Sequence, residues 1–335
     1  MSKFTEIKDY HSLMNLHDTQ IAIKRVKDYF QRSLADELNL LRVSAPTFVS
    51  SESGLNDNLT GIERPVSFDI KDGGAIGEVV HSLAKWKRSA LKRYGFEAGE
   101  GIYTDMVAIR RDEELDNIHS VYVDQWDWEK IIDKKDRTQD CLKDIVKKIY
   151  KSIKSTENYI TAKYDYIKQI LPDDIYFITA DDLLKKYPDK TPKEREYAIC
   201  KEKKAVFISQ VGKILSDGTK HDLRSPDYDD WELNGDILVY YPVLDIALEL
   251  SSMGIRVDEE SLKKQLIEAN CIEREKYPYH QAILNKELPY TIGGGIGQSR
   301  LCLFFLRKAH IGEVHSSLWS KEIYEKAQDC GIILL

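Results

Sequence analysis

The clearest pattern in the chain is an apolar stripe at four-residue spacing. Between residues 18 and 39, apolar side chains recur at every fourth position, at Ala22, Val26, Phe30, Leu34 and Leu38. Positions about one helical turn apart lie on one face, so this spacing predicts an amphipathic helix. A long, charged amphipathic helix is predicted in the same way over residues 139–170, where Ile145, Ile149 and Ile153 repeat the spacing.

A different periodicity predicts strands. Residues 99–130 contain two extended stretches joined by a polar loop, and the second alternates strictly. Val121, Val123 and Gln125 fall on one face of it, and Tyr122, Asp124 and Trp126 fall on the other. Three further strands are predicted over 205–212, 235–244 and 247–257.

Capping signals and turn residues locate the remaining elements. Residues 78–95 are predicted to form a helix rich in Lys and Arg, and a second helix is predicted after Thr191, Pro192 and Glu194, which form a start signal. Residues 40–50 read as a strand that contains Pro46. Because proline cannot donate to a strand ladder, we expect this strand at a sheet edge or a subunit contact.

The order of these elements favours one fold class. Several strands follow each other across short turns, and the helices are grouped between or beyond them, unlike the regular alternation of βαβ units. We therefore predict an α+β fold with a central antiparallel β-sheet flanked by helices. Residues 1–335 are interpreted as a single catalytic domain with a mainly helical insertion at about 130–205.

Composition narrows the class of protein. The 335 residues are 42% hydrophobic and 31% charged, with a net charge of −7 and no basic tail, so an extended nucleic-acid surface is not expected. No apolar run approaches the roughly 20 residues of a membrane helix, and the first residues lack a secretory pattern. We therefore expect a cytoplasmic protein. Five scattered cysteines without a C-x-x-C suit reduced thiols: Cys141, Cys200, Cys271, Cys302 and Cys330.

The glycine-rich stretch TIGGGIGQSRL, residues 291–301, is the first candidate for chemistry. Its spacing does not match the dinucleotide fingerprint, and it ends in Gly-Gln-Ser where a P-loop needs Gly-Lys-Ser or Gly-Lys-Thr. We interpret it as a strand whose glycines let another group lie against the backbone, followed by a helix that presents Arg300. A tight turn with a surface arginine is the simpler alternative when the stretch is taken alone.

The neighbouring motifs change that interpretation. Arg110 ends one predicted strand, and an acidic loop and a returning strand follow it. Together with the later glycine strand and Arg300, this order resembles the catalytic core of class II aminoacyl-tRNA synthetases. LNLLRVSAPTFV resembles the first motif of that class, which lies at its dimer contact. ELSSMGIRV resembles a stretch of the aspartyl and asparaginyl branch.

A closer resemblance covers essentially the whole chain. HSLAKWKR, SVYVDQWDWE, SPDYDDW, LNGDILV, ELSSMGIRVD and TIGGGIGQSR, in this order, are similar to the ammonia-dependent aspartate–ammonia ligase family. The resemblance implies that aspartate is adenylated by ATP and then amidated by ammonia to asparagine, with release of AMP and pyrophosphate. It also implies Mg²⁺ bound with ATP, a homodimer, and no nucleic-acid or membrane partner.

The resemblance also implies a set of site residues. The expected catalytic residues are Asp57, Arg110 and Gln125, and the expected aspartate-binding residues are Lys87, Asp127, Asp229, Ser252 and Arg256. Expected nucleotide-binding residues are Arg110, Ser120, Asp236, Glu249, Gly295 and Arg300, and the expected magnesium ligands are Asp236 and Glu249, since that ion takes hard oxygen ligands. Taken singly, most of these carboxylates and Lys87 also suit a solvated surface, and His81 and His119 suit structural hydrogen bonds.

Three alternatives share parts of this pattern. A tRNA synthetase for Asp or Asn would normally add an anticodon-reading domain, whereas only about seventeen residues precede the first motif-like helix here. A non-catalytic synthetase-like binding protein should lack Arg110 or Arg300. A glutamine-dependent enzyme would need an N-terminal nucleophilic cysteine, but residue 2 is Ser2 and the first cysteine is Cys141. Free ammonia is therefore the expected nitrogen source.

Overall fold

A computed structural model describes residues 4–57, 59, 62–72 and 74–335 of the chain. Its centre is an eight-stranded sheet with the order β1-β5-β6-β11-β10-β9-β8-β7. The strands are β1 (Leu40–Arg42), β5 (Gly101–Ile109), β6 (Tyr122–Ile131), β7 (Tyr176–Thr179), β8 (Ala205–Ser209), β9 (Asp229–Tyr241), β10 (Ile246–Arg256) and β11 (Thr291–Gly297). Only the outermost pairs, β1 with β5 and β7 with β8, are parallel. The predicted α+β class, with a mostly antiparallel sheet, is confirmed.

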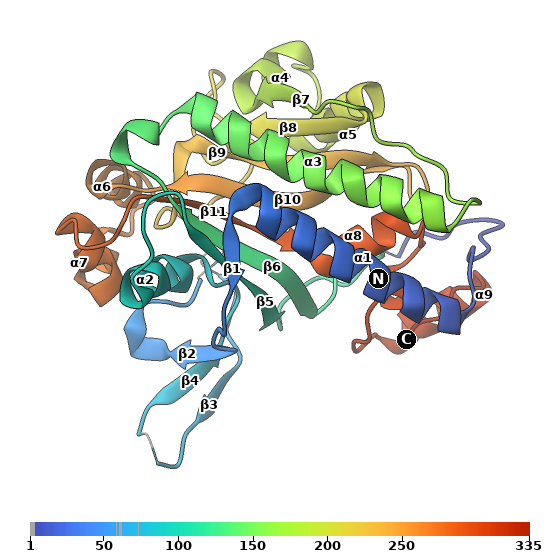
Figure 1. Cartoon of the computed structure of the whole chain (residues 1–335), viewed down its shortest axis with the longest axis horizontal. Helices are drawn as coiled ribbons and strands as arrows, with labels where there is room; N and C mark the ends of the chain where they lie inside the picture. The colour runs from blue at the N-terminus through green and yellow to red at the C-terminus, as the bar shows by residue number, and fades with distance from the viewer. Residues whose placement is uncertain (1–3, 58, 60–61, 73) are drawn as a thin grey trace.

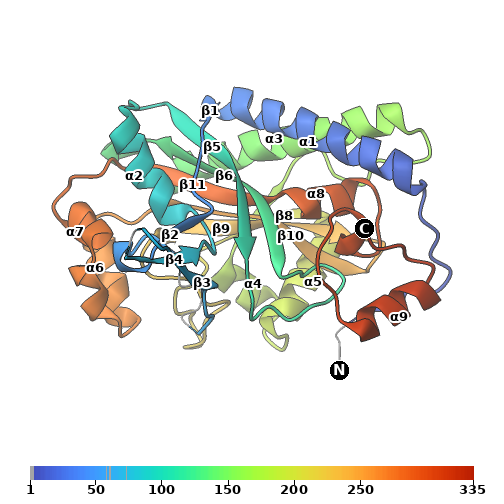
Figure 2. The ribbon, with the colours of Figure 1, turned by 90° about the horizontal axis from the view of Figure 1, so that it is seen from below.

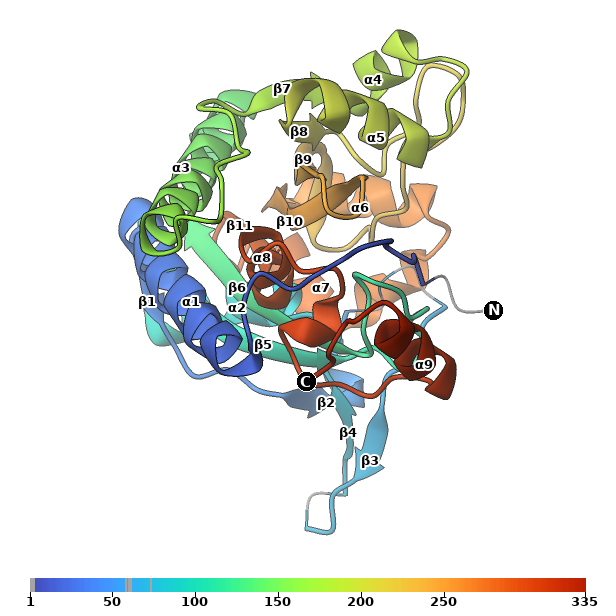
Figure 3. The ribbon, with the colours of Figure 1, turned by 90° about the vertical axis from the view of Figure 1, so that its right-hand side faces the viewer.

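Two long helices cover one face of this sheet. Helix α1 (Leu16–Leu38) and helix α3 (Gln139–Lys163) lie side by side across it, as Figures 1 and 3 show. The apolar stripe predicted for the first helix is fully buried, with Val26, Phe30 and Leu34 at zero exposure. Trp126 and Trp128 of β6 meet the same core, and the ring centroids of Phe30 and Trp126 are 4.8 Å apart. Helix α3 ends seven residues before the predicted position 170.

The opposite face carries a shorter helix and a second sheet. Helix α2 (Ala84–Tyr94) packs against β5 and β6, but it begins six residues later than predicted. The residues before it form β4 (Ile76–Val79), the middle strand of a small sheet with β2 (Phe48–Ser50) and β3 (Ser67–Asp69). The prediction of helix from residue 78 was therefore wrong, because pairing with β2 and β3 overrides local helix propensity. This small sheet projects from the body in Figure 1.

The first edge strand and the predicted helical segment occupy the two edges of the main sheet. The prediction of a single strand over residues 40–50 was wrong, because Pro46 cannot donate to a strand ladder and lies in a loop that divides the segment. Strand β1 before the loop lies at one edge of the main sheet, and β2 after it lies at one edge of the small sheet, so the expected edge position is confirmed for both. Residues 130–205 contain α3, β7, α4 (Ala180–Lys186) and α5 (Pro192–Lys203), so they supply the strand at the other edge. The capping box of Thr191 and Glu194 is present, as predicted. That this segment is an insertion into a single domain stays a prediction.

The C-terminal third completes the molecule around the sheet. Helices α6 (Glu259–Glu268) and α7 (Pro278–Leu284) lie at one end of the central strands, and α9 (Lys321–Asp329) lies at the other (Figures 1 and 2). Helix α8 (Gln298–Phe305) follows β11 directly. In the described part of the chain, none of the helices combines the length and the apolar character that crossing a membrane requires.

His310 gives the fold a specific dependence on pH. The side chain is fully buried between Phe4 and Trp319, and its Nδ1 accepts a hydrogen bond of 3.0 Å from the backbone N–H of Gly312. Burial lowers the pKa of His310 from 6.5 to about 4. The folded state therefore favours the neutral ring, and the stability that this provides is present above about pH 6.5 and is lost between about pH 6.5 and 4.

We expect His310→Asn to flatten the acid limb of the stability curve. Asparagine keeps an acceptor for Gly312 but takes up no proton, so up to about 3 kcal/mol of pH dependence should disappear between pH 6.5 and 4. Urea unfolding of both proteins at half-unit pH steps measures this directly. An identical slope in the variant would remove His310 as the source.

Candidate active site

A cavity of about 340 Å³ opens on the sheet face opposite α1 and α3. Its volume falls in the usual range of small-molecule sites. Of the residues predicted for the site, it is lined by Asp57, Arg110, Ser120, Gln125, Asp127, Asp229, Glu249, Ser252, Arg256, Gly295 and Arg300. Only Lys87 and Asp236 of the predicted set lie behind this lining. The fold therefore brings together residues that lie up to 243 positions apart in the chain, from Asp57 to Arg300.

The alternation of β6 separates the cavity from the core. Gln125, Asp127 and Glu129 point to the cavity side of the strand, while Trp126 and Trp128 point into the core beneath α1. This is the two-residue period expected of a strand with two different environments. The predicted common orientation of Gln125 and Asp127 is confirmed, since both line the cavity.

The glycines of β11 make room for these side chains. A β-carbon at Gly295 would stand 2.5 Å from Oε1 of Gln125, and one at Gly293 would overlap the Glu129 carboxylate. The amide of Gln125 and the carboxylate of Glu129 therefore lie flat against the bare backbone of the neighbouring strand. This agrees with the interpretation of TIGGGIGQSRL as a strand that other groups approach closely, followed by a helix that carries Arg300.

A β-bulge arranges the residues of β10. Its pairing with β9 shifts register between Glu249 and Ser251. A regular strand would turn Glu249 and Ser252 to opposite faces, because they are three positions apart. The bulge brings both of them, together with Arg256, to the cavity.

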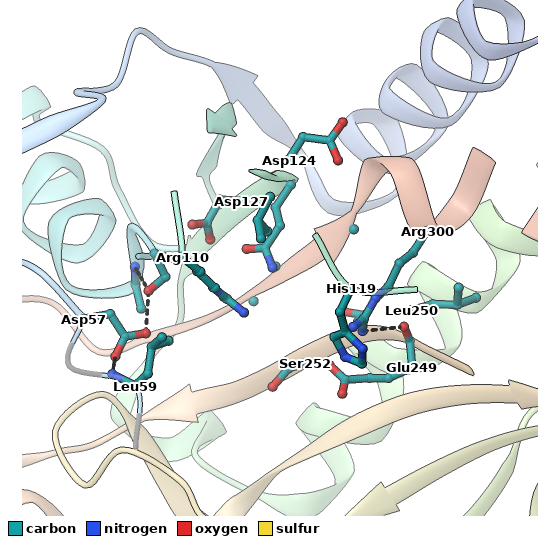
Figure 4. Close-up of a pocket in the computed structure, with 18 of the residues that line it drawn as sticks. Asp57, Leu59, Arg110, His119, Asp124, Asp127, Glu249, Leu250, Ser252 and Arg300 are labelled. Carbon is teal, nitrogen blue, oxygen red and sulfur yellow. Dashed lines mark hydrogen bonds between the residues drawn. The ribbon is translucent and has the colours of Figure 1, made fainter. Parts of the chain in front are cut away.

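Arg110 and Arg300 reach into the same cavity, as Figure 4 shows. Arg110 directly follows β5, and one of its terminal nitrogens donates a weak hydrogen bond of 3.4 Å to the carbonyl oxygen of His81. Its Nε is buried and has no hydrogen-bond partner within the described part of the chain. Arg300 donates a hydrogen bond of 3.1 Å to the carbonyl oxygen of Glu249. Arg110 thus keeps a donor that no described residue occupies, and both guanidinium groups line the cavity in which an anionic ligand would bind.

A row of alternating charges lies beside Arg110. Lys87 donates to Asp127, its Nζ is 3.7 Å from Glu129, and Arg256 pairs with both Glu129 and Asp229. The five side chains are almost completely buried. Three carboxylates against two cations leave one unbalanced negative charge, and the carboxylates at the two ends, Asp127 and Asp229, line the cavity.

Glu129 is the residue of this row that the sequence interpretation missed. Its two carboxylate oxygens accept three hydrogen bonds of 2.7 to 3.1 Å from Arg256, and Oε1 accepts a fourth, of 2.7 Å, from the hydroxyl of Thr291. Burial opposes ionisation, but the Arg256 guanidinium holds the pKa of Glu129 below its ordinary value. The strand alternation after Gln125 and Asp127 is the signal that would have found it. Burial raises the pKa of Asp229 in spite of Arg256.

Asp57 approaches Arg110 from the loop after β2. Its Oδ2 accepts a hydrogen bond of 2.8 Å from Ser82, and its Oδ1 accepts one of 2.8 Å from the backbone N–H of Leu59 (Figure 4). The neighbouring residues 58, 60 and 61 lie outside the described part of the chain. Ser120 also lines the cavity, and its hydroxyl group is 2.6 Å from that of Ser317.

Comparison with known proteins connects this geometry to a family. The family model for aspartate-ammonia ligase matches residues 17–331. The curated aspartate–ammonia ligase of Clostridium perfringens (strain 13) is 62% identical over 336 residues, with complete coverage of both chains. The enzyme of the same name from Ruminiclostridium cellulolyticum is 60% identical, again over both full lengths. The chain belongs to the aspartate–ammonia ligase family.

Solved structures show which fold this ligase family shares. The chain is similar to asparaginyl-tRNA synthetase of Entamoeba histolytica in complex with asparaginyl-adenylate, with a TM-score of 0.62 and 14% identity over 90% of this chain. The synthetase of Pyrococcus horikoshii, complexed with the same adenylate, gives a TM-score of 0.62 at 16% identity, also over 90% of this chain. The chain spans about two thirds of these synthetases, 66% and 70% of their lengths. The predicted class II synthetase-like fold is confirmed.

The two predicted magnesium ligands of the ligase lie on neighbouring strands. Glu249 of β10 lines the cavity, whereas Asp236 of β9 lies behind Arg224, a cavity residue that the sequence interpretation also missed. Burial raises the pKa of Asp236 to about 7, with a further contribution from the charge of Glu249. Its Oδ1 is buried and has no hydrogen-bond partner among the described residues. A buried carboxylate oxygen without a partner among the described residues, with a second carboxylate on the neighbouring strand, fits a divalent cation.

His81 and His119, each weighed as a structural histidine, have partners nearby. His81 is buried, and its Nδ1 is 3.0 Å from the carbonyl oxygen of Asp57. His119 lines the cavity near Arg300 and Glu249 (Figure 4), and its Nδ1 is 2.9 Å from the carboxylate of Asp116. Tyr228, His315 and Arg224 are among the lining residues that sequence reasoning did not select.

Proposed function

We propose that the protein converts L-aspartate, ammonia and ATP to L-asparagine, AMP and pyrophosphate through a β-aspartyl-adenylate. The observation that carries this proposal is the position of Arg110 and Arg300 in one cavity, directly beside the buried charge row of an aspartate–ammonia ligase family member. A cavity with guanidinium donors suits a triphosphate, and an adjacent row of mixed charges suits an amino acid with two carboxylates.

The first step activates the side-chain carboxylate of aspartate. One carboxylate oxygen attacks the α-phosphorus of ATP, a new P–O bond forms, and the bond to the β-phosphate oxygen breaks to release pyrophosphate. Charge develops on the α-phosphate oxygens during this exchange, and Arg110 would stabilise it, since its Nε has no partner among the described residues. Arg300 would lie against the adenine or the terminal phosphates, since its planar cation suits both.

The charge row would hold aspartate in place. Asp127 and Asp229 at the ends of the row would bind the substrate ammonium group, and Arg256 and Lys87 would bind its carboxylates. Lys87 lies behind the lining, but it donates to Asp127 and to the carbonyl oxygen of Gly294, and both of these residues line the cavity. Gln125 and Ser252 would orient the acyl group between the row and the phosphates.

The second step forms the amide. Ammonia attacks the acyl carbon, the bond to the phosphate oxygen of AMP breaks, and the new C–N bond loses one proton. Asp57, held by Ser82 next to Arg110, would accept a proton from nitrogen. Ser120 and Gly295 would contact the nucleotide, because both line the same cavity as Arg110 and Arg300.

A magnesium ion would accompany ATP. Glu249 and Asp236 would hold it together with phosphate oxygens, and the ion would supply charge neutralisation for the triphosphate. We infer shared coordination because the described residues contain no group of three or more His, Cys, Asp or Glu arranged to hold a metal.

The reaction itself is tested with aspartate, ATP, Mg²⁺ and ammonium, with asparagine and AMP assayed together. We expect the two products in equal amounts, and no asparagine when glutamine replaces ammonium. ADP as the nucleotide product would indicate phosphoryl rather than adenylyl activation, and would contradict the proposal.

A homodimer and a cytoplasmic location complete the proposal. The edge strand β1 ahead of Pro46 and the projecting three-stranded sheet with exposed Phe48 and Ile76 leave apolar surface for a second copy. We expect a dimer in sedimentation velocity at micromolar concentration. A species with the 38.7 kDa mass of one chain across that range would contradict it.

A further inference from the structure

Arg224 is the third arginine of the cavity, and its partners differ from those of Arg110 and Arg300. It lies in the loop before β9 with a side-chain exposure of 16%. One terminal nitrogen donates a hydrogen bond of 2.9 Å to the hydroxyl of Ser252, and the other donates to Oδ2 of Asp236. The guanidinium therefore bridges β9 and β10 at the floor of the cavity.

The Arg224 guanidinium lies where the proposed magnesium ion would have to bind. The buried carboxylate of Asp236 and the half-buried carboxylate of Glu249 are proposed to share a magnesium ion with ATP, and Ser252, which pairs with Asp236 across the two strands, adds a hydroxyl oxygen. All three groups are oxygen ligands of the kind that Mg²⁺ takes. Arg224 already donates hydrogen bonds to Oδ2 of Asp236 and to the hydroxyl oxygen of Ser252. A metal ion can therefore bind these two oxygens only when Arg224 has left them.

In the described part of the chain, the ion pair of Arg224 and Asp236 leaves two buried polar atoms without hydrogen bonds. Oδ1 of Asp236 and Nε of Arg224 are both buried, and neither has a hydrogen-bond partner among the described residues. A buried acceptor or donor without a hydrogen bond costs free energy, so both side chains would gain from new partners for these atoms. Arg224 lines the cavity, so its side chain would face the phosphate oxygens of a nucleotide that binds there.

We propose that Arg224 is a built-in cation that neutralises Asp236 and Glu249 before nucleotide binds, and that the magnesium ion of ATP replaces it there. Arg224 then turns to the phosphates, where its planar donors pair with their oxygens. The exchange keeps the two carboxylates compensated in both states and disfavours metal binding without nucleotide. It rests on the proposed function, since it takes ATP as the ligand that brings the metal.

Metal binding without nucleotide tests the exchange directly. Mn²⁺ is titrated into the ATP-free protein, and free Mn²⁺ is measured by electron paramagnetic resonance. We expect Arg224→Met and Arg224→Gln, which remove the cation, to bind Mn²⁺ at least tenfold more tightly than wild type. Arg224→Lys, which keeps a cation, should resemble wild type, and so should Arg42→Met, which removes an arginine that pairs with Asp105 at the surface.

A double variant and a second ligand complete the test. Arg224→Gln combined with Asp236→Asn should lose the gained Mn²⁺ affinity, because the vacated carboxylate is gone. Metal-free ATP should bind Arg224→Gln about tenfold more weakly than wild type, because Asp236 and Glu249 would then repel its phosphates with neither Arg224 nor a metal ion to neutralise them. Equal Mn²⁺ affinity in wild type and both neutral variants would overturn the exchange, even when wild type makes asparagine normally. Failure of wild type to make asparagine would instead contradict the proposed function.

Discussion

Replacing Arg110 with alanine is expected to lower the rate of pyrophosphate release by about 10²–10³, with little change in stability. The reason is that, among the described residues, Nε of Arg110 is buried without a hydrogen-bond partner and the side chain makes one weak hydrogen bond, to the carbonyl oxygen of His81. Its removal therefore costs the fold little. In the proposed mechanism the same donors stabilise the charge that develops on the α-phosphate, and loss of one preorganised donor typically has this size of effect.

The adjacent residue provides the matched control. Arg111 has the same charge but is exposed and does not line the cavity, so Arg111→Ala should keep a rate within about twofold of wild type. Pyrophosphate is measured at saturating aspartate and ATP, and thermal unfolding of both variants checks the fold. A rate for Arg110→Ala within a few-fold of wild type would remove Arg110 from the chemistry.

Replacing Asp229 with alanine is expected to weaken aspartate binding by about 10²-fold, or about 3 kcal/mol, and ATP binding by less than threefold. Asp229 lines the cavity and pairs with Arg256, so its loss removes a proposed contact to the substrate ammonium group and releases one side of the guanidinium. Arg256 remains bound to Glu129, which limits the structural damage.

Calorimetry with each substrate separates the two affinities. Asp217→Ala serves as the control, because Asp217 is an exposed loop carboxylate outside the cavity lining. Asp229→Asn keeps the shape of the side chain and removes its charge, so we expect it to weaken aspartate binding almost as much as Asp229→Ala does. Equal weakening of aspartate and ATP in the alanine variant would place Asp229 outside the amino-acid part of the cavity.

Much of the architecture followed from local patterns. The four-residue stripe of α1, the alternation of β6 and the capping box at Thr191 each reflect a period or a hydrogen bond that nearby residues complete by themselves. Helix α2 was predicted to start six residues early, because pairing of β4 with two distant strands decides the conformation of Ile76–Val79. Pairing between strands that are distant in the chain produces no periodic pattern in the local sequence, so the sequence could not predict it.

Some features of the candidate site could likewise be predicted from the sequence, and others only the tertiary structure showed. The sequence by itself determined the family, through motifs long enough to be specific, and it determined which faces of β6 and β11 carry small, polar or apolar groups. Tertiary structure alone decided that Glu249 and Ser252 share a face, because a bulge depends on how β10 pairs with β9. It alone showed Glu129 between Lys87 and Arg256, and Arg224 against Asp236, because buried ion pairs join residues whose separation in the chain carries no signal.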